Sequence, residues 1–436
     1  MKIAFCGCGY VFDIYMRTRW AHDDLQIMGV FDIDQARAQT VGKHYDLNVY
    51  ATYEELLADD VELVVNLTSI HAHYEQTKAA LLAGKHVYSE KPLTTEFDQA
   101  QELFDLAEER GLIFTGAPCN LFSDSVQTMW KAVRDGAIGN PKLVYAELDD
   151  NPIYLMGVEH WRSATGAPWP YIEEYQEGCT YEHVGYHLVW ICAMLGPARS
   201  VTAFSKQSIA HKTDTPLDPS DTPDFSVGMV DFEGEAAARI TCSIAAPTDH
   251  RLRMIGDEGE ISTESYRMYQ SPVKLERFST VSLNARKAAM VRNQPLLGAR
   301  FGVGGRALKL LRHFRSHATE AEKGNKRSLK QKIMGYIRRR EVYCQDKMLG
   351  IAVMVRAIRE GKPQPMPADF MLHVNELTLL IQNAGPDGVS QKLKTTFKPV
   401  EPLPETLAAP VNYKTSYRPR FLERRLGGAV DSLHSH

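Results

Sequence analysis

Short apolar runs alternate with stretches of helical periodicity along the first 120 residues. The apolar runs predict strands at 3–6, 27–31, 63–67, 86–89 and 113–115. The periodic stretches predict helices at 12–20, 35–45, 74–83 and 96–110, and a capping-box pattern at 52–55 marks one further helix start. Because parallel strands need crossover helices between them, this alternation predicts a doubly wound parallel sheet of the Rossmann type.

The pattern changes beyond residue 140, where apolar runs follow one another as strands. These runs lie at 143–148, 200–205, 225–232 and 237–244. A hairpin is predicted at 255–261, with Gly and Asp expected to supply the positive φ of its turn. Runs of strands of this kind indicate an antiparallel sheet. The fold class is therefore α/β followed by α+β, with a C-terminal domain built on a large antiparallel sheet.

This division gives three predicted regions. Residues 1–120 form a dinucleotide-binding Rossmann domain, and residues 121–385 form an α+β substrate and oligomerisation domain with a basic insertion at 280–338. Residues 386–436 are Pro-rich and are expected to run as an extended tail along the surface.

Composition narrows the class of protein. The chain has 436 residues, 44% of them hydrophobic, which excludes a disordered chain or a small disulfide scaffold. Seven cysteines without metal-type spacing indicate a reducing, cytoplasmic setting. No run approaches the ~18 apolar residues of a membrane-spanning helix. The net charge of −4 gives no reason to expect a nucleic-acid partner.

The charge is unevenly distributed along the chain. Residues 286–340 contain sixteen Lys and Arg but only two acids, a net charge of +14, which leaves −18 on the rest. Residues 306–315 follow a basic, amphipathic helical spacing. The segment would suit an anionic membrane surface, an anionic substrate, or an arm against another subunit of a homo-oligomer. An arm against another subunit, or a segment that is simply exposed to solvent, is favoured, because runs of charged residues are usually solvated.

The first strand–helix turn has the form of a pyrophosphate site. Gly7 and Gly9 allow a tight turn, and the N–H groups at the following helix start, near Tyr10 and Val11, would face the phosphates. Asp32, at the end of the second predicted strand, is placed to bind ribose hydroxyls and to repel a 2′-phosphate. NAD is therefore the expected cofactor. Phe12 occupies the third small position of the fingerprint and weakens the motif.

Several motifs in one order resemble the Gfo/Idh/MocA oxidoreductases. The most specific is Glu90-Lys91-Pro92 at the end of a predicted strand. The others are Thr68-Ser69-Ile70-His71-Ala72-His73, Gly136-Ala137-Ile138-Gly139, the 178–187 segment, Gly256-Asp257-Glu258-Gly259 and 359–363 at the end of a late helix. The resemblance covers about 1–278 and 340–385.

The resemblance implies an NAD-dependent oxidoreductase acting on a small carbohydrate. It implies cofactor contacts from Thr68, His73, Glu90 and Asn120, and a catalytic histidine at His187. Some relatives oxidise a glycoside transiently and reduce the product again, so a redox-neutral NAD-dependent glycoside hydrolase is one alternative. A non-catalytic dinucleotide-sensing regulator is another.

Lys91 and two histidines are the candidate catalytic groups. Lys91 sits where ligands of parallel sheets bind, and burial near nicotinamide is expected to lower its pKa. His183 and His187 are four apart and should share a helix face. The family usually has Asp at the position of His183. Glu182 is not expected to replace it, because neighbours on a helix point about 100° apart.

Two further readings concern the same region. Cys179, His183 and His187 are competent zinc ligands, but three residues on one straight helix span about 12 Å and cannot all reach one ion. A two-histidine site with another ligand is the remaining metal alternative, and no metal is favoured. Between the domains, Trp161, Arg162 and Tyr171 belong to an aromatic and polar stretch that suits a sugar ring. A loop that packs against a partner subunit is nearly as consistent with this composition.

Overall fold

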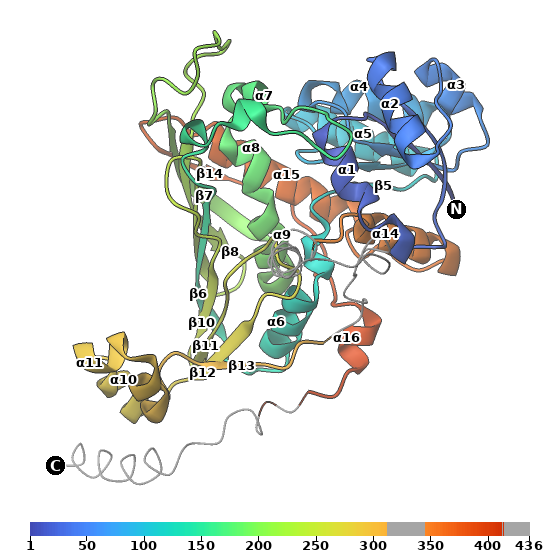
Figure 1. The fold of residues 1–436 in the computed structure, drawn as a ribbon. Coiled ribbons are helices and arrows are strands. Elements are labelled where there is room, and N and C mark those ends of the chain that lie inside the picture. The colour runs from blue at the N-terminus through green and yellow to red at the C-terminus, as the bar shows by residue number, and fades with distance from the viewer. Residues whose placement is uncertain (312–344, 412, 414–436) are drawn as a thin grey trace, which may run out of the picture.

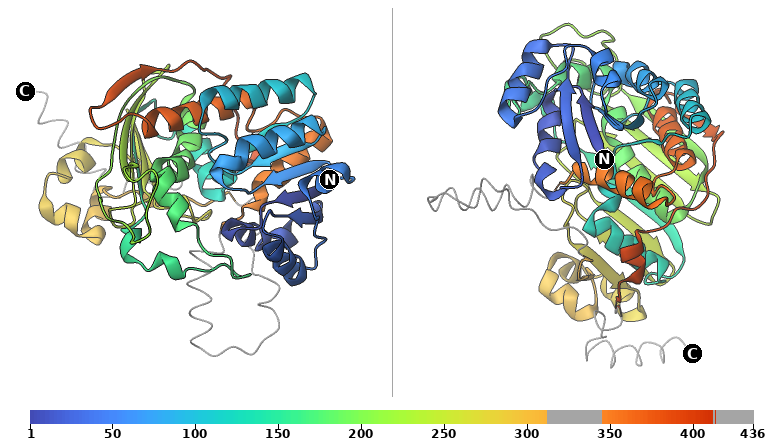
Figure 2. Two further views of the ribbon diagram at one scale, coloured as in Figure 1. Left: turned by 90° about the horizontal axis from the view of Figure 1, so that it is seen from above. Right: turned by 90° about the vertical axis from the view of Figure 1, so that its right-hand side faces the viewer.

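Two β-sheets organise the chain in the computed structural model, which describes residues 1–311, 345–411 and 413 (Figure 1). A five-stranded parallel sheet with helices on both faces is formed by the N-terminal part of the chain. A nine-stranded, mostly antiparallel sheet lies beside it and carries helices on one face (Figure 2). The predicted fold class is confirmed.

The parallel sheet has the strand order β2-β1-β3-β4-β5. Its strands are β1 (Lys2–Cys6), β2 (Gln26–Phe31), β3 (Leu63–Asn66), β4 (His86–Ser89) and β5 (Phe114–Gly116). Its helices are α1 (Tyr10–Met16), α2 (Gln35–Tyr45), α3 (Tyr53–Ala58), α4 (His73–Leu82) and α5 (Phe97–Glu109), with 3-10 turns η1 (Arg19–Ala21) and η2 (Ile70–Ala72). Every predicted strand is found to within one residue. Helix α1 begins two residues earlier than predicted because Gly9 is its N-cap.

Aromatic packing fixes α1 on the sheet. Phe12 is fully buried and packs edge-on against Phe5 of β1, with ring centroids 5.2 Å apart. The bulky ring at this fingerprint position is therefore part of the core. A late helix, α14 (Met348–Glu360), packs against the same cluster through residues such as Ile351. The chain thus returns to the first sheet through a late helix, which ends at the motif at 359–363.

The second sheet has the strand order β13-β12-β11-β10-β6-β9-β8-β7-β14. Its strands are β6 (Pro141–Asp149), β7 (Ala198–Lys206), β8 (Phe225–Phe232), β9 (Ala237–Ser243), β10 (Leu252–Gly256), β11 (Gly259–Thr263), β12 (Val273–Arg277), β13 (Arg306–Ala307) and β14 (Val389–Lys392). Its covering helices are α6 (Asp124–Arg134), α7 (Tyr171–Glu177), α8 (Cys179–His183), α9 (Gly185–Leu195) and α15 (Ala368–Gln382), with 3-10 turns η3 (Cys119–Phe122), η4 (Ile153–Leu155) and η5 (Val158–His160). Alternating burial along β8 and β9 shows that one face is packed and the other is open.

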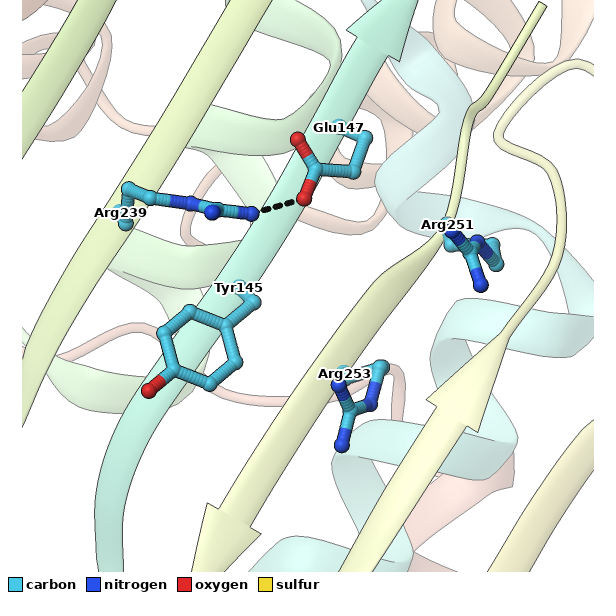
Figure 3. A pocket seen from close by; sticks show the side chains of 5 residues that line it. All are labelled: Tyr145, Glu147, Arg239, Arg251 and Arg253. Atoms are coloured by element: carbon cyan, nitrogen blue, oxygen red, sulfur yellow. Dashed lines mark hydrogen bonds and ion pairs between the residues drawn. The ribbon is translucent and has the colours of Figure 1, made fainter. Parts of the chain in front are cut away.

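The open face carries a charge-paired hollow of about 210 Å³ (Figure 3). It is lined by Tyr145, Glu147, Arg239, Arg251 and Arg253. Arg239 pairs with Glu147 beside it, while Arg251 pairs with Asp249 and Arg253 with Glu260. Each guanidinium therefore already has a carboxylate partner, and the hollow presents no uncompensated positive charge from these three side chains.

The hairpin between β10 and β11 is confirmed, but its glycines serve a different purpose from the predicted one. Neither Gly256 nor Gly259 has a positive φ. A Cβ on Gly256 would lie 2.1 Å from the carbonyl oxygen of Ile138, and one on Gly259 would lie 2.5 Å from that of Glu276. These glycines are needed because neighbouring backbone approaches them closely.

The first part of the predicted insertion is a small helical lobe. It consists of α10 (Thr280–Ala285), α11 (Ala289–Asn293), α12 (Pro295–Gly298) and the 3-10 turn η6 (Ala299–Phe301), and it projects from the β12 end of the sheet (Figure 1). The helical spacing at 306–315 is wrong for its described part. Residues 306–307 form β13 against β12, and the Leu308 N–H donates to the Val273 carbonyl oxygen. The remainder of the insertion, 312–338, lies outside the described residues.

In its described part, residues 386–411 and 413, the predicted tail is only partly extended. Strand β14 pairs antiparallel with β7 at the sheet edge, and α16 (Pro404–Ala408) follows later. Phe397 and Leu403, which lie between these two elements in the sequence, are buried, and the Phe397 ring packs against Phe370 of α15. Within the described part of the chain, no helix has the length and apolar character needed to cross a bilayer.

Candidate active site

A cavity of about 1330 Å³ opens at the carboxyl end of the parallel sheet and continues toward the second sheet. We call its two parts the dinucleotide end and the substrate end. The dinucleotide end is lined by Gly7, Gly9, Tyr10, Val11, Asp32, Thr68 and His73. The substrate end is lined by Lys91, Asp150, Trp161, Trp169, Glu173, Glu174, Glu182, His183, Tyr186, His250 and Arg267.

Glycines keep the dinucleotide end open. Gly7 has φ +99°, and a Cβ there would lie 2.5 Å from the Leu67 carbonyl oxygen, so only glycine lets the turn pass β3. Gly9 caps α1 without a side chain, and nothing lies within 4 Å of a Cβ at that position. The turn therefore leaves room for a phosphate group beside the backbone, as the sequence predicts.

Asp32 is held in a fixed orientation at the end of β2. Its Oδ2 accepts a hydrogen bond from the Cys8 N–H at 2.7 Å, and its Oδ1 accepts one from the Asp34 N–H at 2.8 Å. The side chain still lines the cavity, which suits ribose hydroxyls. The glycine turn, the open space and this carboxylate together fit an NAD molecule.

The predicted contacts at Thr68 and His73 line the cavity and are tied into the fold. The Thr68 hydroxyl donates to Asn66 Oδ1 at 2.7 Å. The buried His73 ring bridges the carbonyl oxygens of Pro92 at 2.7 Å and Thr68 at 3.1 Å. Burial lowers the pKa of His73. This ring therefore positions the turn that borders the cofactor space.

Asn120 does not reach the cavity. It is fully buried, and its Nδ2 donates to the Tyr186 carbonyl oxygen at 3.1 Å. The structure therefore places Asn120 outside the cavity lining. Asn120 lies behind Tyr186, whose own side chain lines the cavity, so the amide supports the cavity wall.

Glu90 is the centre of a buried ion-pair network at the junction of the two ends. Its Oε1 accepts hydrogen bonds from Tyr15 at 2.9 Å and Lys347 Nζ at 2.6 Å. Burial alone would raise the pKa of Glu90, but Lys347 and Lys91 outweigh it and lower the pKa to about 2. Sequence reasoning missed Lys347, which is 257 residues away in the chain. No local motif marks such a partner.

Lys91 forms an ion pair with Glu182, and this corrects two predictions. Burial alone would lower the pKa of Lys91, but the Glu182 carboxylate outweighs it and the pKa is raised. The ammonium is therefore stable, whereas the sequence predicted a lowered pKa. Glu182 was not expected to replace the missing Asp at 183. It does so because the cavity wraps the end of α8, so both Glu182 and His183 line it.

His183 lies between two carboxylates. Its Nε2 is 3.0 Å from Glu174 Oε1, and its Nδ1 is 3.4 Å from Asp150 Oδ2. Burial by itself lowers the pKa of His183, but these two carboxylates raise it overall. The predicted catalytic histidine thus reaches the cavity as a ring with an acidic partner on each side.

His187 does not join the cavity. Helix α8 ends at His183 and α9 begins at Gly185, with Val184 between them in helical conformation, and of the two histidines only His183 lines the cavity. The His187 ring is fully buried against Trp190, with centroids 5.1 Å apart, and both ring nitrogens lack a hydrogen-bond partner. Burial lowers its pKa to about 3. The structure therefore places the His187 ring in the core, outside the lining of the cavity where the resemblance implies a catalytic histidine.

A polar network that the sequence did not indicate completes the substrate end. Asp150, just after β6, accepts a hydrogen bond from His250 Nε2 at 3.0 Å and forms an ion pair with Arg267. The Arg267 Nε also donates to the Tyr266 hydroxyl at 2.9 Å. Because these residues come from three separate loops, no spacing in the sequence reveals their convergence.

The loop at 151–170, which we call the strap, crosses from the second sheet to α1 (Figure 1). Trp161 and Trp169 both line the cavity, with ring centroids 5.2 Å apart. Arg162 instead donates to the carbonyl oxygens of Glu159 and Trp161 and does not line the cavity. Tyr171 also lies outside the lining and packs edge-on against Tyr175. Of the predicted substrate residues, only Trp161 is placed in the cavity.

The tip of the strap is tied to the first sheet region through a buried carboxylate. Asp13 of α1 accepts hydrogen bonds from the backbone N–H and the hydroxyl of Thr165, both at 2.8 Å, and from Tyr45 at 2.6 Å. Burial alone would raise the pKa of Asp13, but its hydrogen bonds lower it. We refer to the Asp13–Thr165 contact as the latch.

The zinc alternative finds no support in the geometry. Cys179 is buried against Cys242, whose thiol donates to the Cys179 carbonyl oxygen at 3.4 Å. His187 lies in the core rather than beside His183. Across residues 1–311, 345–411 and 413, no three His, Cys, Asp or Glu side chains are grouped to hold a metal ion.

Two family models match the chain. One, described as an oxidoreductase family with an NAD-binding Rossmann fold, matches residues 1–117. The other, the GFO/IDH/MocA C-terminal domain, matches residues 126–262. Together they cover more than half of the chain and include the Glu90-Lys91-Pro92 and α8 regions.

Individual relatives share only a modest sequence identity with this chain. An uncharacterized oxidoreductase of Synechocystis is 26% identical over 296 residues, which are 63% of this chain and 76% of that protein. The scyllo-inositol 2-dehydrogenase (NADP(+)) of Bacillus subtilis is 27% identical over 184 residues, which are 42% of this chain and 48% of that protein. The fold matches the WlbA dehydrogenase of Bordetella pertussis in complex with NADH and UDP-GlcNAcA, with a TM-score of 0.62 at 14% identity, covering 90% of this chain and 97% of that one.

Proposed function

The chain belongs to the Gfo/Idh/MocA family of NAD-binding oxidoreductases, and from this premise we propose that it is a dehydrogenase of sugar derivatives. In the proposed reaction, hydride passes between NAD and a hydroxyl-bearing carbon of the substrate. The observation that carries the proposal is the Lys91–Glu182 ion pair, which lies in the same cavity as the Gly7–Gly9 turn and Asp32.

Bound NAD would accept or donate the hydride at its nicotinamide. The chain itself must then orient the substrate oxygen and handle its proton. Lys91 is held as an ammonium by Glu182, so it can bind and polarise the reacting oxygen. Glu182 fixes the ammonium in place, and His183 lies on the same wall as the second proton-handling group.

Aromatic and polar side chains in the substrate end support a carbohydrate substrate. The Trp161 and Trp169 faces offer flat apolar surfaces, while Arg267 and His250 offer hydrogen bonds to hydroxyl groups. The inositol dehydrogenase of Bacillus subtilis acts on a cyclic polyol, which supports the same class of substrate.

We also infer a preference for NAD over NADP. The Asp32 carboxylate lines the cavity where a 2′-phosphate would approach, and two like charges at that distance repel. Arg37 also lines this region and lies 3.4 Å from Asp34 Oδ2, so its charge is shared with a neighbouring carboxylate.

The test is a turnover assay with NAD or NADH and a panel of polyols and sugars, including scyllo-inositol, free aldoses and UDP-linked sugars. We expect NADH formation or consumption with one class of the panel and its loss in Lys91→Met. Equal turnover in Lys91→Met, with both proteins folded by circular dichroism, would contradict the proposal.

A redox-neutral glycoside hydrolase is the second candidate, and the latch favours it. Because the strap residues and α1 residues line one cavity and are tied together by Thr165 and Asp13, a bound dinucleotide would be held under the strap. Release of an aglycone with catalytic NAD and no net NADH would establish this activity. Net NADH formation in proportion to product would exclude it.

A further inference from the structure

The two always-charged cations of the substrate end, among the residues that the structure describes, already have carboxylate partners. Lys91 forms an ion pair with Glu182, and Arg267 forms one with Asp150. Lys347, at the junction of the two ends, is likewise bonded to a carboxylate. An anionic group on a substrate would therefore have to compete with an existing carboxylate for any of these three cations.

Glu173 of α7 differs from these carboxylates, because no described cationic side chain pairs with it. It lines the cavity, and its Oε1 accepts a hydrogen bond from the Ile70 N–H at 3.2 Å. The imidazole of His71 pairs with Glu177 instead. Burial raises the pKa of Glu173, and the Glu182 carboxylate raises it further. Glu173 is thus a cavity carboxylate whose charge is uncompensated by its described neighbours.

Two tryptophan faces border the same cavity. Trp161 and Trp169 both line it, with ring centroids 5.2 Å apart. Trp169 precedes Glu173 by only four residues, and both side chains reach the lining. The face of an indole ring attracts a cation as well as a sugar ring. A carboxylate together with indole faces is chemistry that recognises an ammonium group.

We propose that Glu173 is a specificity-determining residue that binds a protonated amino group of the substrate, so that the substrate is an amino sugar or an aminopolyol. This inference rests on the proposed oxidoreductase function and names the substrate class within it. An ammonium group supplies the cation that Glu173 lacks, whereas a hydroxyl group leaves its charge uncompensated. A uronate or a sugar phosphate is disfavoured, because its negative charge approaches a carboxylate without a counter-ion.

A metal ion suits this arrangement less well than an organic cation. In the described part of the chain, no three His, Cys, Asp or Glu side chains are grouped to hold a metal. The carboxylates next to Glu173 are engaged, since Glu174 lies 3.0 Å from His183 and Glu182 pairs with Lys91. An ammonium group needs only one carboxylate and donates its remaining hydrogen bonds to neutral acceptors.

The nicotinamide ring is the other cation that bears on Glu173, because Ile70 borders the cofactor space. The oxidised ring is positively charged and the reduced ring is neutral. A carboxylate that served the cofactor would therefore favour NAD over NADH, and it would not distinguish an amino compound from its hydroxyl counterpart.

The experiment compares compounds that differ in a single group. Calorimetric titration of the full chain saturated with NADH measures the affinity for glucosamine against glucose, for scyllo-inosamine against scyllo-inositol, and for glucuronate. The test variant is Glu173→Gln, which removes the charge but keeps an oxygen that can accept from the Ile70 N–H. The matched control is Glu159→Gln, because Glu159 is an exposed carboxylate of the strap outside the cavity lining.

In wild type we expect at least one amino compound to bind ~10-fold or more tightly than its hydroxyl counterpart, and glucuronate to bind more weakly than glucose. Glu173→Gln should abolish the amine preference, and Glu159→Gln should keep it. A wild-type chain that binds no amino compound, or binds the members of each pair equally, overturns the proposal. A preference that persists in Glu173→Gln overturns it as well.

The cofactor alternative is decided by the same two variants. If Glu173→Gln weakens binding of NAD relative to NADH while the substrate preference is unchanged, Glu173 serves the cofactor and the proposal is overturned.

Failure of the proposed function gives a different result from failure of this inference. Binding is measured with the reduced cofactor and needs no hydride transfer. An amine preference that Glu173→Gln abolishes therefore supports the recognition even if no compound of the panel is oxidised. NADH formation with equal efficiency from amino and hydroxyl compounds would support the oxidoreductase and overturn the inference.

Discussion

The two ends of the cavity are built in different ways. The dinucleotide end depends on backbone geometry, with glycines at 7 and 9 and one oriented carboxylate at Asp32, all within a short stretch of sequence. The substrate end depends on ion pairs between segments far apart in the chain, such as Lys91 with Glu182 and Asp150 with Arg267. The binding site for the common cofactor is therefore formed by local structure. The groups expected to act on the substrate are positioned by ion pairs between distant segments.

The largest expected effect comes from the substrate end. Replacing Lys91 by Met removes the ammonium that polarises the reacting oxygen, so kcat/KM should fall by roughly 10²–10⁴-fold. Steady-state turnover with the best sugar of the panel measures it. Lys78→Met is the control, because Lys78 of α4 is paired with Glu102 of α5, outside the cavity lining. A similar loss of kcat/KM in Lys78→Met would mean that the effect comes from impaired folding and not from removal of the Lys91 ammonium.

The second-largest effect is expected at the dinucleotide end, when a methyl group is added to the turn at Gly7. Gly7→Ala combines a positive φ with a Cβ 2.5 Å from the Leu67 carbonyl oxygen, so the turn must shift. We expect NAD affinity to fall about 100-fold, measured by calorimetric titration. Gly84→Ala shares the positive φ but has open space around its Cβ, and it should leave NAD affinity nearly unchanged. Unaltered affinity in Gly7→Ala would contradict the assigned pyrophosphate turn.

The preference between NAD and NADP tests the role of Asp32, the carboxylate of the dinucleotide end. Asp32→Ala removes the charge that faces a 2′-phosphate, so the ratio of NADP to NAD affinity should rise at least ~10-fold. Parallel titrations with both dinucleotides give this ratio. Asp60→Ala is the control, because Asp60 is exposed and pairs with Lys2 outside the cavity lining. Tighter binding of NADP than of NAD by the unmodified chain would contradict the role given to Asp32.

The smallest expected effect concerns the latch that joins the two ends. Asp13→Asn weakens the charge-assisted hydrogen bonds to Thr165, and dissociation of NADH should become about fivefold faster. Stopped-flow fluorescence of bound NADH measures this rate. Thr165→Val keeps the backbone donor and should have a smaller effect. A dissociation rate that is the same in all three proteins would show that the strap does not retain the cofactor.

The sequence predicts the fold and the dinucleotide end because their signals are local. Each strand of the first sheet is a short apolar run, and Gly7, Gly9 and Asp32 stand at fixed offsets from those runs. Periodicity failed at 306–307, where an edge strand pairs with β12, because an amphipathic pattern does not say which neighbour a segment meets.

The substrate end was predicted only in part for the same reason. Lys91 and His183 were identified, but Glu182, Glu174 and Lys347 acquire their roles through the meeting of separate elements. His187 was assigned from the family resemblance, and the structure instead buries its ring against Trp190. Residues that form ion pairs across a cavity have no characteristic spacing in the sequence, so a sequence pattern does not reveal them.

The most direct test of the central claim is the turnover of the sugar panel by wild type, Glu182→Gln and Lys91→Met, with NADH followed by absorbance and folding checked by thermal melting. The account predicts clear turnover in wild type and a loss of at least ~100-fold in both variants, because the ammonium and the carboxylate that fixes it act as a unit. Turnover that persists in both folded variants would contradict it.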